Sequence, residues 1–308
     1  MSIRVSAIIC TYNRAEYLRK AIQSLTNQTL HKDQYEILIV DNGGTDNTQQ
    51  VVKKFSNVGN IRYIYEPISG LSQARNAGWL NAKGEYVAYL DDDAIASPQW
   101  FEKILEAFET VKPKPGCVGG KIEPIWEAPK PIWLSDKTFL QLTVLDWSPI
   151  PIFLNDKQWL AGANIAYPQK LLKDVGGFKT TLGRRGNRLF SMEENLVRIQ
   201  LEKMGYRCYY HPEIVVRHHI LPQRLTKKWF LRKSYLNGVS SALIKIYLEA
   251  PSLLNRLQKG FTTIIRILFS PRELISLIAE TSDPEMFALK CSVLARLGNI
   301  MKLWGLAR

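Results

Sequence analysis

The segment Tyr86–Ala94 constrains the fold more than any other part of the sequence. It reads YVAYLDDDA, a short apolar and aromatic run that ends in three aspartates. The run is typical of a strand buried in a sheet, and Asp91, Asp92 and Asp93 stand where that strand leaves the sheet. Adjacent carboxylates repel one another, and a divalent cation with oxygen ligands compensates them. Because open α/β sheets bind ligands at the carboxyl ends of their strands, we expect a metal-assisted site for a phosphate-bearing ligand. The aspartates alone are equally consistent with a solvated acidic turn.

Strand-like and helix-like segments alternate through the first half of the chain, which predicts βαβ units and a mostly parallel sheet flanked by helices. The expected strands are Val5–Cys10, Tyr35–Val40, Ile61–Tyr65 and Tyr86–Leu90. The expected helices are Ala15–Leu25, Thr48–Phe55, Leu71–Ala82 and Pro98–Thr110. We therefore expect a catalytic α/β domain at residues 1–222.

The second half changes character after Pro113. Residues 113–158 read as long loops with short strands and exposed tryptophans, which are Trp126, Trp133 and Trp147. Further segments are expected as a strand at Trp159–Tyr167, a helix at Met192–Met204, and two short strands at Tyr206–Tyr210 and Ile214–Arg217. From Leu225 onward the pattern is helical, so we expect a basic helical region at residues 223–308.

The four cysteines, Cys10, Cys117, Cys208 and Cys291, lie far apart and form no CxxC pair. This spacing predicts free thiols in a reducing compartment, with neither disulfides nor a zinc site. The first residues, MSIRVSAIIC, lack an apolar leader, and no uncharged apolar run reaches eighteen residues. We therefore expect a cytoplasmic protein.

Positive charge is concentrated near the C-terminus. The formal net charge is +13, and residues 227–308 hold 13 Lys and Arg against 5 Asp and Glu. A basic region of this kind suits an anionic membrane surface on the inner face, although it also suits a merely solvated basic face. Ser252–Phe269 mixes apolar and cationic residues at helical spacing, which favours either a helix in the membrane interface or one packed on the main domain. No nucleic-acid-binding motif is present, so we expect no nucleic-acid partner.

Polar clusters follow each of the first four expected strands: TYNR, DNGGTDNT, GLSQARNAG and the aspartates. Together they describe a nucleotide cleft. Asp41 can accept a hydrogen bond from a base or ribose, and Arg75 can pair with a pyrophosphate. Each cluster also has a structural interpretation, as a turn, a helix cap or a surface arginine.

The ordered set of motifs resembles family 2 glycosyltransferases of the GT-A fold, which use nucleotide-diphosphate sugars. The matching stretches are TYNR, DNGGTDNT, GLSQARNAGWLNAKGEYVAYLDDDA, AGANIAYPQ and SMEENLVRIQLEKMGYRCYYHPEIVVRHH, over about residues 3–220. The resemblance implies a GT-A, Rossmann-like, mostly parallel sheet flanked by helices, with a C-terminal helical extension.

The resemblance also assigns roles. The aspartates match the DxD motif, so Asp91 is expected at the ribose and the metal, and Asp93 at the metal. The residues expected to hold the nucleotide sugar are Thr11, Asn13, Asp41, Arg75, Asp91, Asp92 and Asn164. A late histidine, His218 or His219, is expected to add a metal or phosphate contact. The implied cofactor is Mn²⁺ or Mg²⁺.

The start of the helix at Ser191 carries the catalytic expectation. The family usually has Glu-Asp there, and the second carboxylate is the general base; this chain has Glu193-Glu194, one methylene longer at the second position. We expect Glu194 to be the base, with Glu193 as a rival. Two glutamates at a helix start also complement the helix dipole. The cationic loop Arg184–Arg188 that precedes them is a candidate lid over the diphosphate.

The expected function is an inverting, metal-dependent, hexosyltransferase-like transfer from a nucleotide-diphosphate sugar to a hydroxyl of a saccharide or lipid-linked acceptor, as in polysaccharide biosynthesis. One alternative is a catalytically degenerate binding or scaffold protein. Another is a sugar nucleotidyltransferase, which would need a glycine-rich phosphate loop near the N-terminus that TYNRAEY does not supply.

Overall fold

A computed structural model describes residues 2–186 and 190–307. The chain divides into two compact units. The first contains Met1–Ile125, Thr143–Thr181 and Glu193–His219, and the second contains Trp126–Leu142, Leu182–Met192 and Ile220–Arg308. The helical unit thus takes in two segments from earlier in the chain, and the boundary expected between residues 222 and 223 stays a prediction.

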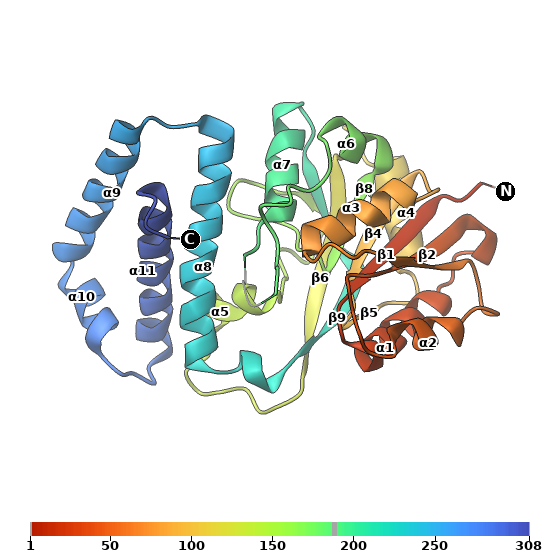
Figure 1. The fold of residues 1–308 in the computed structure, drawn as a ribbon, viewed down its shortest axis with the longest axis horizontal. Helices are drawn as coiled ribbons and strands as arrows, with labels where there is room; N and C mark the ends of the chain where they lie inside the picture. The colour runs from red at the N-terminus through yellow and green to blue at the C-terminus, as the bar shows by residue number, and fades with distance from the viewer. Residues whose placement is uncertain (1, 187–189, 308) are drawn as a thin grey trace. The chain divides into compact units, whose positions relative to one another are not determined.

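The first unit is built on one nine-stranded mixed sheet (Figure 1). Its strand order is β3-β2-β1-β4-β8-β6-β9-β5, and β7 pairs with β9. Pairing is parallel among β1, β2, β3 and β4, and antiparallel for β4–β8, β6–β8, β5–β9 and β7–β9. The strands are β1 (Val5–Thr11), β2 (Tyr35–Asp41), β3 (Ile61–Tyr65), β4 (Tyr86–Asp91), β5 (Ala94–Ala96), β6 (Cys117–Trp126), β7 (Ile152–Phe153), β8 (Asn164–Pro168) and β9 (Cys208–Ile220).

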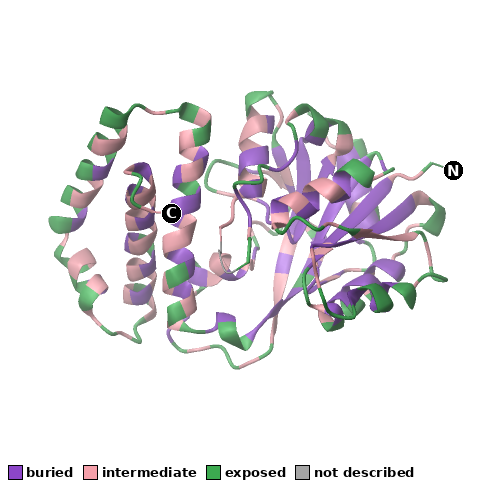
Figure 2. Ribbon diagram, viewed as in Figure 1, coloured by how far each residue is buried: buried purple, intermediate pink, exposed green. Residues whose placement is uncertain are grey.

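Helices cover both faces of this sheet (Figure 2). Side chains along each strand alternate between the two faces. Val5, Ala7 and Ile9 of β1 belong to the hydrophobic cluster formed with α1 and α4, whereas Ile8 belongs to the cluster formed with α3, α6 and α7. Double coverage explains why the strands read as continuous apolar runs. The helices are α1 (Ala15–Thr26), α2 (Thr48–Lys53), α3 (Leu71–Asn81), α4 (Trp100–Thr110), α6 (Gln169–Asp174) and α7 (Glu193–Lys203).

The parallel strands end in register at one edge of the sheet. Thr11, the last residue of β1, pairs with Asp41, the last residue of β2. On the other side of β1, Cys10 pairs with Asp91 at the end of β4. The hydrophobic pattern fixes this register, because a slip of one residue would turn each strand's core side chains to the other face.

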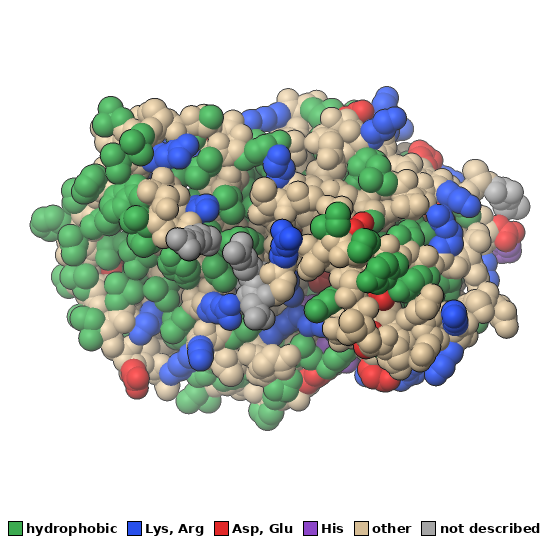
Figure 3. Space-filling model, viewed as in Figure 1, with side chains coloured by type: hydrophobic (Ala, Val, Ile, Leu, Met, Phe, Trp, Pro, Cys, Tyr) green, Lys and Arg blue, Asp and Glu red, His purple; other side chains and the backbone are tan. Residues whose placement is uncertain are grey.

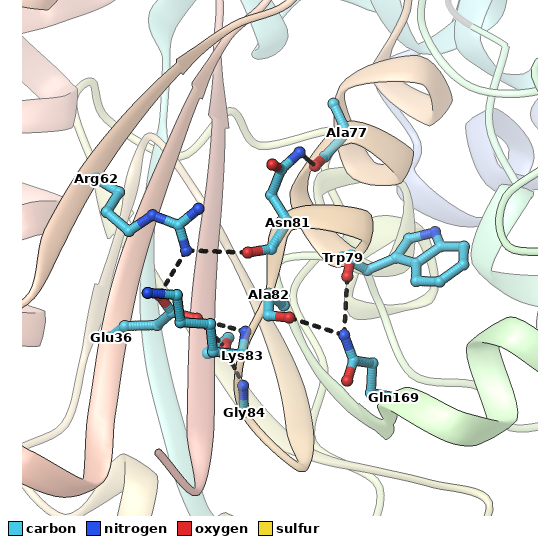
Figure 4. Close-up of polar contacts among 10 residues, drawn as sticks. Glu36, Arg62, Ala77, Trp79, Asn81, Ala82, Lys83, Gly84 and Gln169 are labelled. Carbon is cyan, nitrogen blue, oxygen red and sulfur yellow. Dashed lines mark hydrogen bonds and ion pairs between the residues drawn. The ribbon is translucent and has the colours of Figure 1, made fainter. Parts of the chain in front are cut away.

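A polar network fastens the opposite edge, where the strands begin (Figure 4). The buried Glu36 carboxylate accepts hydrogen bonds from the Ser6 hydroxyl at 2.7 Å, the Lys83 backbone N–H at 2.6 Å and the Arg62 guanidinium at 2.9 Å. Gln169 donates to the carbonyls of Trp79 and Ala82 at 3.1 and 2.9 Å. These bonds fix the turn from α3 into β4, and so the direction of β4, whose C-terminal end leads into Asp91, Asp92 and Asp93.

The second unit is helical. Its α8 and α11 pack closely, since a Cβ on Gly238 would overlap the backbone of Ala295. Trp133 is buried against Phe230 and Phe287. The helices are α5 (Asp136–Phe139), α8 (Lys227–Glu249), α9 (Leu253–Leu268), α10 (Pro271–Ile278) and α11 (Pro284–Leu303). Within residues 2–186 and 190–307, no helix combines the length and hydropathy required to cross a bilayer.

The structure corrects several expected elements. Residues 117–126, expected as loop with short strands, form the ten-residue strand β6, and the two short strands expected after Tyr206 are one strand, β9. Trp133, expected to be exposed, is buried. The strand expected from Trp159 begins at Asn164. The cationic loop at 184–188 lies partly outside the described residues.

The cysteine prediction was wrong for one pair. Cys117 at the start of β6 and Cys208 at the start of β9 form a disulfide, with their Cα atoms 4.8 Å apart. They are 91 residues apart in the sequence, and the neighbouring positions of β6 and β9 in the sheet bring them together. Cys10 and Cys291 are free, as predicted. The expectation of a reducing compartment therefore loses its support from the cysteines.

Candidate active site

Hydrogen bonds tie together the loops that follow β1 and β2. The Asn13 side-chain oxygen accepts from the backbone N–H of Thr45 at 2.7 Å and of Asp46 at 3.3 Å. In return, the Asp46 carboxylate accepts from the backbone N–H of Ala15, at the start of α1, at 3.0 Å. The two polar loops predicted to hold a nucleotide therefore form one structure.

Asp41 lies inside this structure. Its carboxylate is buried and accepts from the Gly44 backbone N–H at 2.9 Å and from the Tyr63 hydroxyl at 2.8 Å. Burial and the bond to Asp41 raise the pKa of Tyr63, so the phenol stays protonated as a donor. Each carboxylate oxygen has a second lone pair, which leaves Asp41 able to accept a bond from a ribose or base.

Arg14 compensates part of the negative charge of the aspartate cluster. Its guanidinium lies 3.0 Å from Asp92 and 2.9 Å from Asp93. Asp92 also accepts from the Thr11 hydroxyl at 2.8 Å. Burial and the neighbouring Asp93 charge raise the pKa of Asp92 to about 6. Asp92 therefore has protein partners on both oxygens and holds β1, β4 and the TYNR loop together.

Asp91, Asp93 and His218 form a group that fits a divalent cation. One potential ligand atom from each lies within 4.8 Å of the others. The imidazole of His218 is buried with Nε2 3.0 Å from Asp93 Oδ1, and its Nδ1 has no hydrogen-bond partner among the described residues. Two carboxylates and an imidazole are a donor set that Mn²⁺ accepts readily.

His219 points to a different environment. Its ring packs edge-on against Tyr17 with centroids 5.3 Å apart, and its backbone N–H donates to the Asp93 carbonyl at 2.9 Å. Of the two adjacent histidines, the structure brings His218 into the acidic group.

Arg75 of α3 joins the acidic group to the start of α7. Its guanidinium is buried and makes an ion pair with Glu193. It also lies 3.9 Å from Glu194 and 4.0 Å from Asp91. Burial disfavours its charge, but Glu193, Glu194 and Asp91 together raise the pKa of Arg75 above its ordinary value. Arg75 is therefore a permanent buried cation shared by three carboxylates.

Close packing holds this cation in place. The guanidinium lies 5.8 Å from the ring centre of Tyr89 and 5.5 Å from that of Phe178. The Tyr89 hydroxyl donates to the Arg75 carbonyl at 3.0 Å. A Cβ on Gly162 would overlap the guanidinium, so any larger residue at position 162 would have to displace Arg75.

The two glutamates at the start of α7 differ in environment. The Glu193 side chain is 4% exposed and holds the ion pair with Arg75, whereas the Glu194 side chain is 15% exposed. Glu194 is therefore the less buried of the two carboxylates. Burial raises the pKa of the nearby Cys10 thiol to about 12, so this thiol is protonated at neutral pH.

Asn164, also predicted as a site residue, is buried and has its side chain hydrogen-bonded within the fold. It is 1% exposed. Its side chain accepts from the Trp100 indole at 2.8 Å and donates to the carbonyls of Lys121 and Ile214 at 3.1 and 2.8 Å. These contacts tie the start of β8 to α4, β6 and β9, and none of them supports a sugar-binding role.

Sequence reasoning assigned no role to Arg14 or Tyr63. The role of Arg14 could have been predicted, because Arg14 follows the first expected strand, next to the strand that ends in the aspartates. The role of Tyr63 could not, because an interior tyrosine of β3 reads only as a core residue.

Comparison with known proteins agrees with this geometry. The family model for glycosyl transferase family 2 matches residues 6–173. A glucosyl-dolichyl phosphate glucuronosyltransferase from Haloferax volcanii is 27% identical over 248 residues, which cover 79% of this chain and 78% of that protein. A validoxylamine A glucosyltransferase from Streptomyces hygroscopicus is 26% identical over 56% of this chain and 46% of its own length.

Two solved structures share the fold. The mannosyltransferase PcManGT from Pyrobaculum calidifontis, in complex with GDP-Man and Mn²⁺, superposes with a TM-score of 0.62 at 18% identity over 99% of this chain and 88% of its own. TarS from S. aureus, residues 1–349 with UDP-GlcNAc, superposes with a TM-score of 0.58 at 18% identity over 99% and 90%. The α/β architecture and the GT-A fold expected from the sequence are confirmed.

Proposed function

The chain belongs to glycosyl transferase family 2, and we propose that it is a metal-dependent, inverting transferase that moves a hexose to a hydroxyl of a saccharide or lipid-linked acceptor. Its donor is a nucleotide sugar. The observation that carries the proposal is the arrangement around Arg75. This one buried cation connects Asp91, in the acidic group, with Glu193 and Glu194 at the start of α7.

Asp91, Asp93 and His218 would hold the Mn²⁺ or Mg²⁺ ion, which supplies charge stabilisation to the departing diphosphate when bound. The His218 imidazole and the two carboxylates place one potential ligand atom each within 4.8 Å of the others, which supports this assignment. The neighbouring loops carry Asn13 and Asp41, to which we assign the nucleoside. Thr11 and Asp92 support that wall of the site.

Glu194 is the residue to which we assign general-base catalysis. A sugar hydroxyl is a weak nucleophile at neutral pH, and a positioned carboxylate accepts its proton as the new bond forms. The acceptor oxygen forms a bond to the anomeric carbon while the bond from that carbon to the diphosphate oxygen breaks, and the diphosphate leaves with the electron pair. A single displacement from the opposite face inverts the anomeric configuration.

Glu193 has a positioning role in this proposal. Its ion pair with Arg75 fixes the first turn of α7, and so the direction from which Glu194 meets the acceptor. The half-buried thiol of Cys10 stays protonated, which agrees with a mechanism without a covalent sugar–enzyme intermediate.

The test is a panel of nucleoside diphosphates and nucleotide sugars, each with Mn²⁺, with Mg²⁺ and with a chelator. Thermal shift measures binding, since a selective ligand stabilises the fold. Product analysis measures release of nucleoside diphosphate. We expect the nucleotides of one base to stabilise the protein, and to do so only when metal is present. The Asp93→Ala variant should lose that stabilisation. Binding without turnover of any sugar would favour a catalytically inactive binding protein, and formation of nucleoside triphosphate would favour a nucleotidyltransferase.

A further inference from the structure

The α9–α10 segment of the helical unit carries large apolar side chains that face solvent. Four of them, Leu254, Phe261, Ile265 and Leu268, are spaced seven, four and three residues apart, which places them on one side of α9. Their exposed fractions run from 51% to 71%. Phe269 and Ile278 are each 84% exposed. We call this set the apolar ridge: Leu254, Phe261, Ile265, Leu268, Phe269 and Ile278. Figure 3 shows hydrophobic side chains gathered over α9 and α10.

The apolar ridge lies away from the buried side of α9, although its Phe261 also contacts the Trp304 ring, with centroids 5.3 Å apart. A different side, with Gly260 and Ile267, is buried. There the Trp304 indole lies against Gly260, and its N–H donates to the Arg256 carbonyl at 3.2 Å. Because α9 already has a packed side, the exposed apolar residues are surplus to the fold of the helical unit, and such a patch marks an interaction surface.

The charge on α9 indicates the kind of partner. The helix carries Arg256, Lys259 and Arg266 and has no acidic residue in its sequence. Lys259 and Arg266 are exposed and seven residues apart, so they line a second solvent-facing side of the helix. Two copies of this chain paired through α9 would bring these cations toward like charges, whereas an anionic surface complements them.

The length of α9 indicates how it would meet a bilayer. Sixteen residues extend about 24 Å, and a membrane span needs about 20 apolar residues. A helix of this length with one apolar side and a basic side lies in the plane of the interface.

We propose that the α9–α10 segment is a membrane-docking surface, in which the apolar ridge inserts among the lipids of an anionic bilayer while Lys259 and Arg266 contact the headgroups. The proposal is independent of the proposed transferase activity, because it uses no residue of the candidate active site. It gives a physical basis to the basic C-terminal region noted in the sequence.

Co-sedimentation of the full chain with vesicles tests the proposal. The vesicles are phosphatidylcholine alone, or phosphatidylcholine mixed with phosphatidylglycerol. We expect binding to the anionic vesicles at low salt and weaker binding to the neutral ones. The ridge variant combines Ile265→Ser with Phe269→Ser, and its matched control combines Ile132→Ser with Ile150→Ser, which are exposed apolar residues elsewhere. The ridge variant should bind at least about tenfold more weakly than the wild type, and the control should bind normally.

A second pair of variants tests the charge. Lys259→Glu with Arg266→Glu should abolish the preference for anionic vesicles, whereas Lys114→Glu with Lys170→Glu, an equal charge change at exposed positions, should retain most of it. Circular dichroism establishes that each variant is folded. A wild-type chain that stays in the supernatant with anionic vesicles at low salt overturns the proposal, as does a ridge variant that binds normally. Sedimentation velocity that shows a dimer, made monomeric by the ridge variant, without vesicle binding would assign the surface to self-association instead.

Discussion

Replacement of Glu193 by glutamine removes one partner of the buried Arg75 ion pair and keeps the side-chain shape. Both side chains are almost fully buried, with exposed fractions of 5% for Arg75 and 4% for Glu193. Loss of one partner from such a pair costs about 3 to 5 kcal/mol, because the remaining charge is left buried. Asp91 and Glu194 stay within 4.0 Å of the guanidinium, so we expect the low end, about 3 kcal/mol.

Urea unfolding followed by tryptophan fluorescence measures this loss, and a thermal scan should show a fall of roughly 6 to 12 °C in Tm. The matched control is Glu202→Gln on the same helix. Glu202 pairs with Arg198 at 3.0 Å and is 34% exposed, so its loss should cost no more than about 0.5 kcal/mol.

A double variant distinguishes the effect of losing the whole Arg75–Glu193 ion pair from the effect of leaving Arg75 without this partner. Arg75→Met with Glu193→Leu removes both charges, and exchange of a buried pair for apolar residues is often neutral. We therefore expect the double variant to unfold at higher urea than Glu193→Gln alone. Stability of Glu193→Gln within about 1 kcal/mol of the wild type would refute the reasoning, since the charge on Arg75 would then need no partner.

The other glutamate should behave in the opposite way. Glu194→Gln should unfold within about 1 kcal/mol of the wild type and bind nucleotide normally, because its side chain is more exposed. Its turnover should fall by about 10² to 10⁴ if it is the base. Near-normal turnover of Glu194→Gln would contradict that assignment, whatever the stability of the Glu193 variant.

Three further predictions concern stability. In the folded state the pKa of Asp92 is raised to about 6, so folding favours the protonated carboxyl. Relative to Asp92→Asn, the wild type should therefore lose up to about 3 kcal/mol of stability as the pH rises from about 4 to 6. Tm measured for both proteins over that pH range checks this, and equal slopes would contradict it. After unfolding without reductant, two of the four cysteines should react with a thiol reagent, and four reactive thiols would disprove the disulfide. The double variant Cys117→Ser with Cys208→Ser should lose up to about 4.6 kcal/mol of unfolding free energy, measured in urea. Gly162→Ala should displace Arg75 and lower Tm by several degrees, and an unchanged Tm would show that the guanidinium has room to move.

The sequence indicated the parallel half of the sheet because its information there is local. Buried strands read as apolar runs, and polar residues mark where each strand ends. Asp91, Asp93 and His218 were expected near one another, although 125 residues separate the last two, because the family resemblance extended through β9. The expected bounds of β3, α1, α3 and α4 agree with the observed bounds within two residues at each end.

The misses share a different physical origin. The disulfide depends on β6 lying beside β9, and the pairing of two strands so far apart in the sequence leaves no mark in the spacing of the cysteines. The prediction divided the continuous strand β9 in two around Pro212, because a strand accepts proline only where the missing backbone N–H is not needed for pairing. The burial of Trp133 comes from contacts with Phe230 and Phe287, about a hundred residues or more along the chain.

Because β1, β2 and β4 end in register, the length of these strands is constrained, whereas the loops that follow them can vary. An insertion or deletion within one of these strands would reverse its inward and outward side chains along the remaining length. Replacement of the loop after a strand leaves that alternation intact, since loops tolerate changes of length and sequence. Residues 42–47 can therefore change in length and sequence while Asp41 and Asp91 keep their places.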